Sequence, residues 1–175
     1  MSETMLALVA LMITTFFVYS QQRGLVETER ELASIELEVL ADAVGSEVME
    51  QIAVKPFDAA TIGINPQEAS LTDLTASVAF GDGLNYPDAC DDIDDFNDMQ
   101  PDTVFFEVGR DSVGDPFGFD FVVTAEVSYV DGEGYRTPNR TWVKEVTLFV
   151  DQAVGASGKK YQRAPILLKQ HFSLQ

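Results

Sequence analysis

The residues with the clearest chemical potential are the aspartates of a short loop that runs from Asp88 to Asp98. The four most closely spaced members are Asp91, Asp92, Asp94 and Asp95. Carboxylate oxygens are the ligands that Ca²⁺ prefers, so these four residues are the candidate metal ligands. The run departs from the EF-hand pattern, because Phe96 and Asn97 stand where that loop needs a ligand and a glycine. The alternative is a solvated acidic turn whose carboxylates accept hydrogen bonds from backbone amides.

Residue types that support catalysis are sparse. Cys90 is the single cysteine and His171 the single histidine, so neither an intramolecular disulfide nor a Cys/His zinc site is expected. His171 lies in an alternating stretch and is predicted to be a surface residue. The sequence contains no Ser/His/Asp arrangement, no nucleotide-binding glycine loop and no HExxH motif. We therefore expect a protein that is not an enzyme and that needs no cofactor apart from the calcium considered above.

The net charge restricts the partners. The chain has 29 acidic and 11 basic side chains, a formal charge of −18. Nucleic acid is not expected as a partner, because binding it requires cations that displace phosphate counterions. Docking on an anionic membrane surface is also disfavoured, because it relies on basic residues that are attracted to acidic lipids. Two interpretations of the acidity remain open, namely solubility in a salt-rich habitat and binding of a divalent cation or a basic partner.

The element that must organise these residues is the N-terminal segment, residues 1–54. The stretch from Thr4 to Gln22 carries no charge, and no proline occurs before Pro56. The pattern predicts one continuous helix of about 50 residues, which would be about 75 Å long. Its first part, residues 1–22, is predicted to be a membrane or filament-core segment, and residues 55–175 are predicted to form a globular head.

Three interpretations of the apolar segment compete. A secretory signal is disfavoured, because Glu3 precedes the apolar run and the first basic residue is Arg23. A plain membrane span needs about 20 apolar residues, close to the length available. The third interpretation is a helix that lies in the membrane before assembly and in a filament core afterwards.

Two apolar stripes continue along the polar half of the helix and favour the third interpretation. The first contains Leu37, Leu40, Val44, Val48 and Ile52, and the second contains Leu25, Leu32, Ile35 and Val39. We expect these faces to contact the head or neighbouring subunits. Gly24 and Gly45 are predicted weak points, since glycine costs up to about 1 kcal/mol relative to alanine inside a helix.

The remainder of the chain predicts an α+β protein. Residues 57–87 alternate turn signals with short apolar runs, and the acidic loop spans residues 88–102. Alternating, β-branched and aromatic patterns predict strands over residues 119–130, 142–150 and 165–172. We expect an antiparallel meander within residues 117–175, covered by the C-terminal half of the helix. Asn139 begins a glycosylation tripeptide in a predicted loop.

This arrangement resembles the type IV pilin-like family, which includes type IV pilins, minor pilins of the mannose-sensitive haemagglutinin type and type II secretion pseudopilins. The likeness covers most of the chain: a helix of about 50 residues with an apolar first half, a loop-rich connection, and a meander on the helix. Two local stretches add to it. Residues 90–96 (CDDIDDF) are similar to an acidic loop of some minor pilins, and residues 122–130 with 142–150 are similar to their paired strands.

The chain also differs from that family. No basic leader ending in glycine precedes Met1, so the resemblance implies that Met1 is the processed terminus or that processing differs. The family's register-setting acid matches Glu3 only with an offset of two residues. The proline that commonly kinks the family's helix is missing, and Gly24 is the nearest substitute.

The resemblance implies a structural subunit of an extracellular type IV pilus-like filament. The chain would reside in the inner membrane before assembly, and its partners would be copies of itself and the pilus assembly machinery. Residues expected in subunit packing are Glu3, Leu6, Val9, Ile13, Phe16, Phe17, Leu25 and Leu32. The acidic loop and the strands would face outward. The alternatives are a minor pseudopilin of a secretion machine and a membrane-tethered monomeric domain that binds calcium or another ligand.

Overall fold

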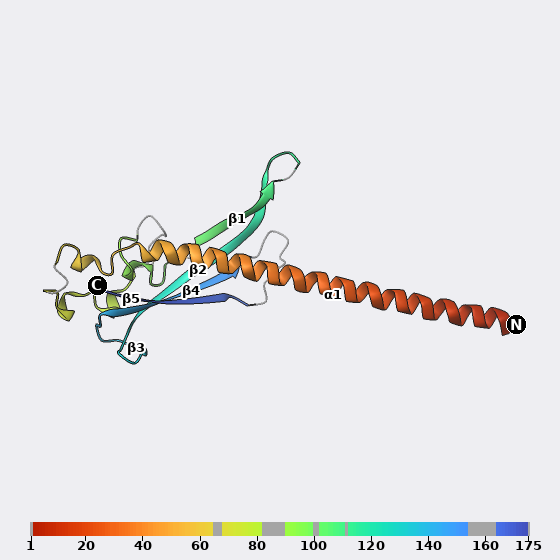
Figure 1. Ribbon diagram of the computed structural model, residues 1–175, viewed down its shortest axis with the longest axis horizontal. Coiled ribbons are helices and arrows are strands. Elements are labelled where there is room, and N and C mark those ends of the chain that lie inside the picture. Colours follow the sequence, from red (N-terminus) through yellow and green to blue (C-terminus); the bar gives the residue numbers. More distant parts are fainter. Residues whose placement is uncertain are drawn as a thin grey trace.

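The computed structural model describes residues 2–64, 68–81, 90–99, 102–110, 112–153 and 164–174. Helix α1 (Ser2–Ala53) has 52 residues and projects far beyond the head that holds the rest of the chain (Figure 1). At a rise of about 1.5 Å per residue it is roughly 78 Å long. The predicted long helix is confirmed, and it ends shortly before Pro56, as expected from the restriction that proline places on the preceding residue.

The head contains one antiparallel sheet. Its strands are β1 (Asp102–Arg110), β2 (Pro116–Val130), β3 (Arg136–Thr137), β4 (Val143–Gln152) and β5 (Ile166–Ser173). The order is β1-β2-β4-β5, and β3 pairs with β2. The α+β class and the three predicted strands are confirmed as β2, β4 and β5. The sequence from Asp151 to Lys160 predicts a hairpin connection between the last two strands, and most of it falls outside the described residues.

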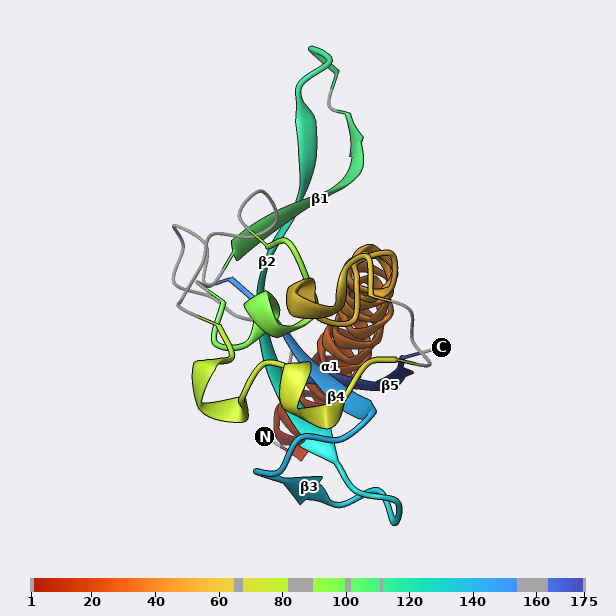
Figure 2. The ribbon, with the colours of Figure 1, turned by 90° about the vertical axis from the view of Figure 1, so that its left-hand side faces the viewer.

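The predicted start of the sheet at residue 117 is wrong, because β1 precedes it. Strand β1 pairs with β2 from Asp102 opposite Val123 to Arg110 opposite Pro116. Its residues have strand-forming types, but β1 lies at the edge of the sheet and Phe105 and Val108 are each 49% exposed. Such a half-exposed edge strand lacks the clear alternation of a covered strand. The far end of the β1–β2 hairpin extends away from the head (Figure 2).

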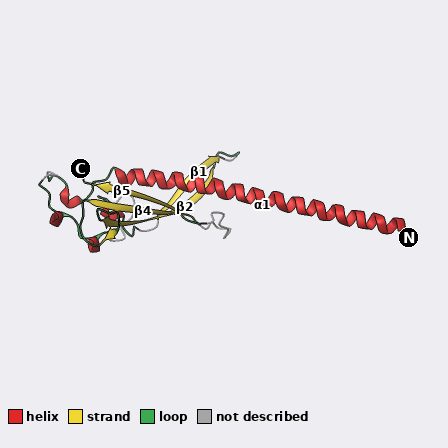
Figure 3. Ribbon diagram, turned by 60° about the horizontal axis from the view of Figure 1, so that its bottom comes forward, coloured by secondary structure: helices red, strands yellow, loops and turns green. Residues whose placement is uncertain are grey.

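The core lies between the C-terminal half of α1 and one face of the sheet. Figure 3 shows α1 running along β4 and β5. The first predicted stripe is the buried one, since Leu37, Val44, Val48 and Ile52 are at most 3% exposed and Leu40 is half-buried. They pack against alternate residues of β2 and β4, among them Phe121, Val123, Leu148 and Val150. The second stripe, Leu25, Leu32, Ile35 and Val39, stays exposed.

Gly45 has a packing role that the sequence did not predict. A Cβ at this position would lie 2.4 Å from Cδ1 of Leu168 and 3.0 Å from Cγ2 of Val150. The missing side chain therefore allows α1 to approach β4 and β5 closely. A Cβ added at Gly24 would meet nothing within 4 Å beyond its own helix backbone, and the helix continues through this residue.

Between α1 and β1 the described chain forms short 3-10 turns joined by irregular segments. The turns cover Ala59–Thr61, Leu71–Asp73, Ser77–Ala79 and Asp94–Phe96. The predicted loop-rich connection is confirmed for the described parts of residues 57–87. The last turn belongs to the acidic loop and lies against β2, where Asp98 N donates to the carbonyl of Ala125.

Candidate assembly helix and buried acidic cluster

The projecting half of α1 is the first candidate functional element. Every described side chain from Thr4 to Leu32 is exposed, and the first buried side chain is Ser34. Among the described residues, α1 is the one helix that is long and apolar enough to cross a membrane. The Thr14 and Thr15 hydroxyls donate to the carbonyls of Ala10 and Leu11 at 3.0 and 2.8 Å. Their polar groups are thus satisfied within the helix, as an apolar environment requires.

The predicted packing residues whose side chains are described are all exposed and can meet a partner. Leu6 and Phe16 are 70% and 75% exposed. The others with described side chains are also exposed: Val9, Ile13, Phe17, Leu25 and Leu32. The side chain of Glu3 lies outside the described residues, so its pairing stays a prediction. An exposed apolar surface of this extent marks a protein or membrane contact.

The acidic loop is the second candidate, and the structure divides its aspartates. Asp92 and Asp94 are buried, with 4% and 3% exposure, whereas Asp91 is exposed and Asp95 half-buried. The expectation that the loop faces outward is therefore wrong for Asp92 and Asp94. The physical reason is that the intervening and following apolar residues, Ile93 and Phe96, belong to the core and draw the loop inward.

The loop satisfies many of its own polar groups. Asp95 Oδ2 accepts from the backbone N–H groups of Asp91 at 2.7 Å and Asp92 at 3.3 Å. Asp92 Oδ1 accepts from those of Asp94 at 2.8 Å and Asp95 at 3.2 Å. Asp92 Oδ2 also accepts from the N–H of Ala59 at 2.5 Å. The capping of backbone amides by aspartates is confirmed, within a turn that is partly buried rather than solvated.

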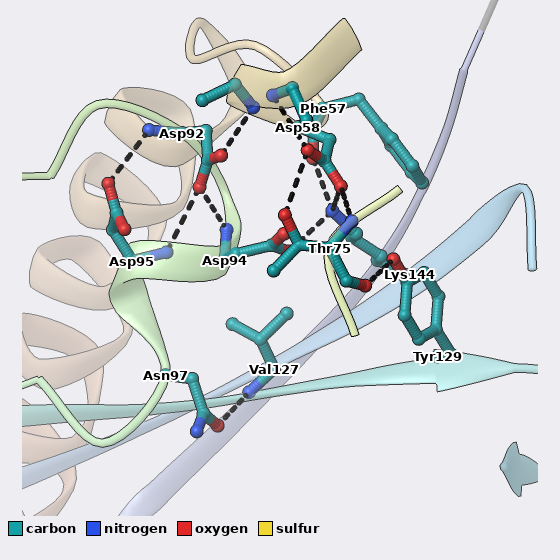
Figure 4. A network of polar contacts seen from close by, with 12 residues as sticks. Phe57, Asp58, Thr75, Asp92, Asp94, Asp95, Asn97, Val127, Tyr129 and Lys144 are labelled. Carbon is teal, nitrogen blue, oxygen red and sulfur yellow. Dashed lines mark hydrogen bonds and ion pairs between the residues drawn. The ribbon is translucent and has the colours of Figure 1, made fainter. Parts of the chain in front are cut away.

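Two residues distant in sequence complete a buried cluster. Asp58 follows the end of α1, and Lys144 comes from β4; both side chains are 0% exposed. Lys144 Nζ lies 2.5 Å from Asp94 Oδ1 and 3.4 Å from Asp58 Oδ2, and it donates to the carbonyl of Phe57 at 2.6 Å. Figure 4 shows the three side chains pointing toward one another. Sequence reasoning missed both residues; a lysine inside an otherwise apolar strand pattern was the available signal.

The three carboxyl groups of the cluster have different environments. Burial raises the pKa of Asp94 to about 7, although the nearby Lys144 opposes this. Burial also raises the pKa of Asp92, against hydrogen bonds from Ala59 and Asp95. For Asp58, burial is outweighed by hydrogen bonds from Thr75 and Ala60 and by the charge of Lys144, so its pKa is lowered. The cluster therefore holds one carboxyl group whose pKa is raised, Asp94, beside another whose pKa is lowered, Asp58.

The same cluster bears on the calcium prediction. Carboxylate oxygens of Asp58, Asp92 and Asp94 lie within 4.8 Å of one another. Asp91 and Asp95, also predicted as ligands, are not part of this group. The ammonium of Lys144 already supplies a positive charge among the three carboxylates. Calcium binding by Asp92 and Asp94 stays a prediction, with Asp58 as the third carboxylate.

A separate polar network covers the sheet face opposite α1. Glu145 Oε1 lies 2.9 Å from Arg136 Nε and 3.3 Å from Lys169 Nζ, and Glu145 Oε2 lies 3.3 Å from His171 Nε2. Burial raises the pKa of Glu145, but hydrogen bonds from these three side chains outweigh it and lower the pKa to about 2. The side chain of His171 is 52% exposed, which confirms the predicted surface position.

Comparisons with protein-family models, curated proteins and solved structures find no match for this chain. Its function must therefore be inferred from the projecting helix and the head themselves.

Proposed function

We propose that this chain is a structural subunit of an extracellular type IV pilus-like filament that polymerises through the apolar half of α1. The observation that carries the proposal is the division of one continuous helix at Ser34. The described side chains from Thr4 to Leu32 are exposed, and those from Met5 to Tyr19 are mostly apolar, whereas from Ser34 onward one face is packed on the sheet. The part of α1 before Ser34, which we call the rod, would mediate assembly. The head would form the filament surface.

The energetics favour a partner for the rod. Burying a large apolar side chain that was exposed to water is worth about 1.5–3 kcal/mol, and more than ten such side chains project from α1 before Ser34. A lipid bilayer and a bundle of identical helices both satisfy this demand. Side-chain packing and polar pairing determine which of these two environments the rod prefers, because lipid is as apolar as the helices themselves. The proposal places the rod in the inner membrane before assembly and in the filament core afterwards.

The exposed second stripe supports packing between subunits over a longer stretch. Leu32, Ile35 and Val39 are 56–63% exposed although the opposite face of the same helix turns is buried in the head. A simple membrane tether has no need for apolar residues on the outer face so far from the span. Neighbouring rods could cover this face in a filament.

The first experiment shears surface material from cells that produce the chain and examines it by negative-stain microscopy and intact-mass spectrometry. The proposal expects thin filaments in which this chain is the dominant species. Mass spectrometry would also show where the mature chain begins and whether Asn139 is modified. If the chain stays in the membrane fraction as a monomer and filaments lack it, the filament proposal fails.

A pair of matched substitutions sharpens this test. Phe16 on the rod and Val78 on the head are both strongly exposed, at 75% and 94%. Phe16→Asp would place a charge in an apolar contact, so we expect loss of filaments, whereas Val78→Asp should retain them. Charges are costly in either apolar environment. Equal effects of the two substitutions would contradict assembly through the rod.

Two other functions would appear as different outcomes. A minor pseudopilin of a secretion machine would be found in sheared material only as a small fraction. A membrane-tethered monomeric domain would remain with the membrane, and its head would bind a ligand on its own. The Asp58, Asp92 and Asp94 group is the feature that favours this second alternative, with calcium titration of the head as its direct assay.

A further inference from the structure

We propose that the side chains of Lys144 and Asp94 join after folding in an intramolecular amide bond, with Asp58 as the proton acceptor. This proposal concerns only the head, so it stands independently of the filament. It rests on the geometry of three buried side chains from separate segments: the end of α1, the acidic loop and the central strand β4 (Figure 4).

The reacting atoms are already close together. Lys144 Nζ lies 2.5 Å from Asp94 Oδ1, so the carboxyl carbon is at most about 3.7 Å from the nitrogen. Pairs of reacting atoms held near 3–3.5 Å form near-attack arrangements with effective concentrations far above those in solution. The fold thus removes most of the entropic cost of bringing amine and acid together.

Asp94 is the more suitable electrophile of the two aspartates beside Nζ. It is the nearer one, and its Oδ2 is buried with no hydrogen-bond partner among the described residues. Burial of both oxygens without further partners disfavours the carboxylate, and the neutral acid is the form that an amine can attack. Nothing in the described surroundings holds this carboxyl group as a fixed carboxylate apart from Lys144 itself.

Asp58 has the properties of the base. Its carboxylate accepts hydrogen bonds from the N–H of Thr75 at 2.7 Å and of Ala60 at 3.0 Å, and from the Thr75 hydroxyl at 3.1 Å. These contacts fix the position of the carboxylate beside Nζ, where it can accept a proton.

The reaction balances without any external reagent. Asp58 removes one proton from the Lys144 ammonium, and the freed lone pair on Nζ forms a C–N bond to Cγ of protonated Asp94. The tetrahedral adduct then loses a second nitrogen proton, and one C–O bond breaks. The departing oxygen leaves as water, carrying that proton and the original Asp94 proton, while Asp58 keeps the first. One amide and one water molecule result from an amine and an acid.

The surroundings favour the amide. Water competes poorly where the side chains of Lys144, Asp58 and Asp94 are at most 4% exposed. The rings of Phe57, Phe80 and Tyr129 lie 4.2, 5.3 and 5.5 Å from Nζ and exclude solvent from one side. Amide formation also removes charges from this region, where unpaired charge is expensive. The product would fasten the acidic loop covalently to β4.

The test is the intact mass of the purified full-length chain under denaturing conditions. The proposal expects a mass lower than that of the sequence by one water molecule. An aspartyl succinimide would cause the same loss, so a tryptic map must locate the bond. Trypsin does not cleave after an acylated lysine, and we expect residues 141–159 to remain joined to the peptide that carries Asp94.

Matched variants separate this bond from an ion pair. Lys144→Met and Asp94→Ala should restore the full mass, whereas Lys169→Met should keep the loss of water. Lys169 is a suitable control, because it lies 3.3 Å from Glu145 but is 47% exposed. Asp58→Asn should leave a larger unlinked fraction in protein of the same age, because it removes the base.

The decisive result does not depend on whether the variants fold. A wild-type chain that shows the full sequence mass after prolonged incubation in its folded state would overturn the proposal. So would a water loss that maps to any position other than the bond between Lys144 and Asp94. Complete linkage in Asp58→Asn would overturn the role assigned to Asp58.

Discussion

At the scale of single residues, two neighbours on β4 illustrate how the fold assigns roles. Lys144 points toward Asp58 and Asp94 on the side of the sheet that faces α1, and it lies opposite Tyr129 of β2. Glu145 points to the other side and meets Arg136, Lys169 and His171. Alternation along a strand sends adjacent side chains to opposite faces. The two charges therefore belong to separate networks, and each needs its own partners.

The network around Glu145 predicts a specific acid sensitivity. Its pKa is lowered to about 2 in the folded chain, so its stabilisation is present above the ordinary value of 4.5 and is lost as the pH falls from there toward 2. Glu145→Gln should remove this part of the pH dependence. We expect a loss of roughly 1–2 kcal/mol at neutral pH, because the partner side chains are about half exposed and solvent screens them.

Urea unfolding at a series of pH values, followed by the fluorescence of the single tryptophan Trp142, measures this effect. Glu133→Gln provides the control, because Glu133 is exposed in the turn after β2. The interpretation fails if the wild type and Glu145→Gln lose stability in parallel below pH 4.5.

At the scale of elements, the contact between α1 and the sheet depends on one missing side chain. Gly45 lies against Leu168 and Val150, so the helix backbone approaches β4 and β5 at this point. Gly24, in the exposed part of the same helix, has open space around it. The two glycines have the same low helix propensity, but only one of them is required by packing.

Substitution of each glycine should therefore have a different result. Gly45→Val should destabilise the head by roughly 1–3 kcal/mol, because the added atoms must displace Leu168 or Val150. Gly24→Ala should leave the urea midpoint of the head unchanged while it strengthens the helix locally by up to about 1 kcal/mol. Denaturation of both variants beside the wild type gives the comparison. A Gly45→Val head as stable as the wild type would show that the helix can move away at little cost.

At the scale of the whole molecule, the chain consists of a rod and a head that share one helix (Figure 1). The described rod side chains before Ala33 are all exposed and do not contribute to the core. The head contains the remaining turns of α1, the sheet and the acidic loop. The packing that stabilises the head is therefore separate from the exposed part of α1.

This separation predicts that the head folds without the rod. A variant that begins at residue 27 should be a soluble monomer with the same urea midpoint as the full chain in detergent, because the described side chains that it lacks, from Thr4 to Val26, are all exposed. Size-exclusion chromatography with light scattering reports the oligomeric state, and Trp142 fluorescence reports unfolding. A variant that is unfolded or that assembles as the full chain does would contradict the division at Ser34.

The sequence by itself determined the elements whose signals are local. The long helix follows from an uninterrupted run without proline, and the stripe from Leu37 to Ile52 identifies its buried face, because a helix repeats every 3.6 residues. Strands β2, β4 and β5 follow from alternation and β-branched residues. The sequence also predicted that aspartates of the acidic loop would cap backbone amides.

Only the tertiary structure decided the features that depend on distant partners. Strand β1 is defined by its pairing with β2, and the fit of Gly45 by the position of Leu168. The cluster joins Asp58, Asp94 and Lys144, whose separation along the chain gives no local pattern. The sequence of the acidic loop favoured a solvated turn, because closely spaced aspartates are strongly hydrated when they are ionised. It is partly buried because Ile93, Phe96 and the charge of Lys144 together outweigh the hydration of two of its carboxylates.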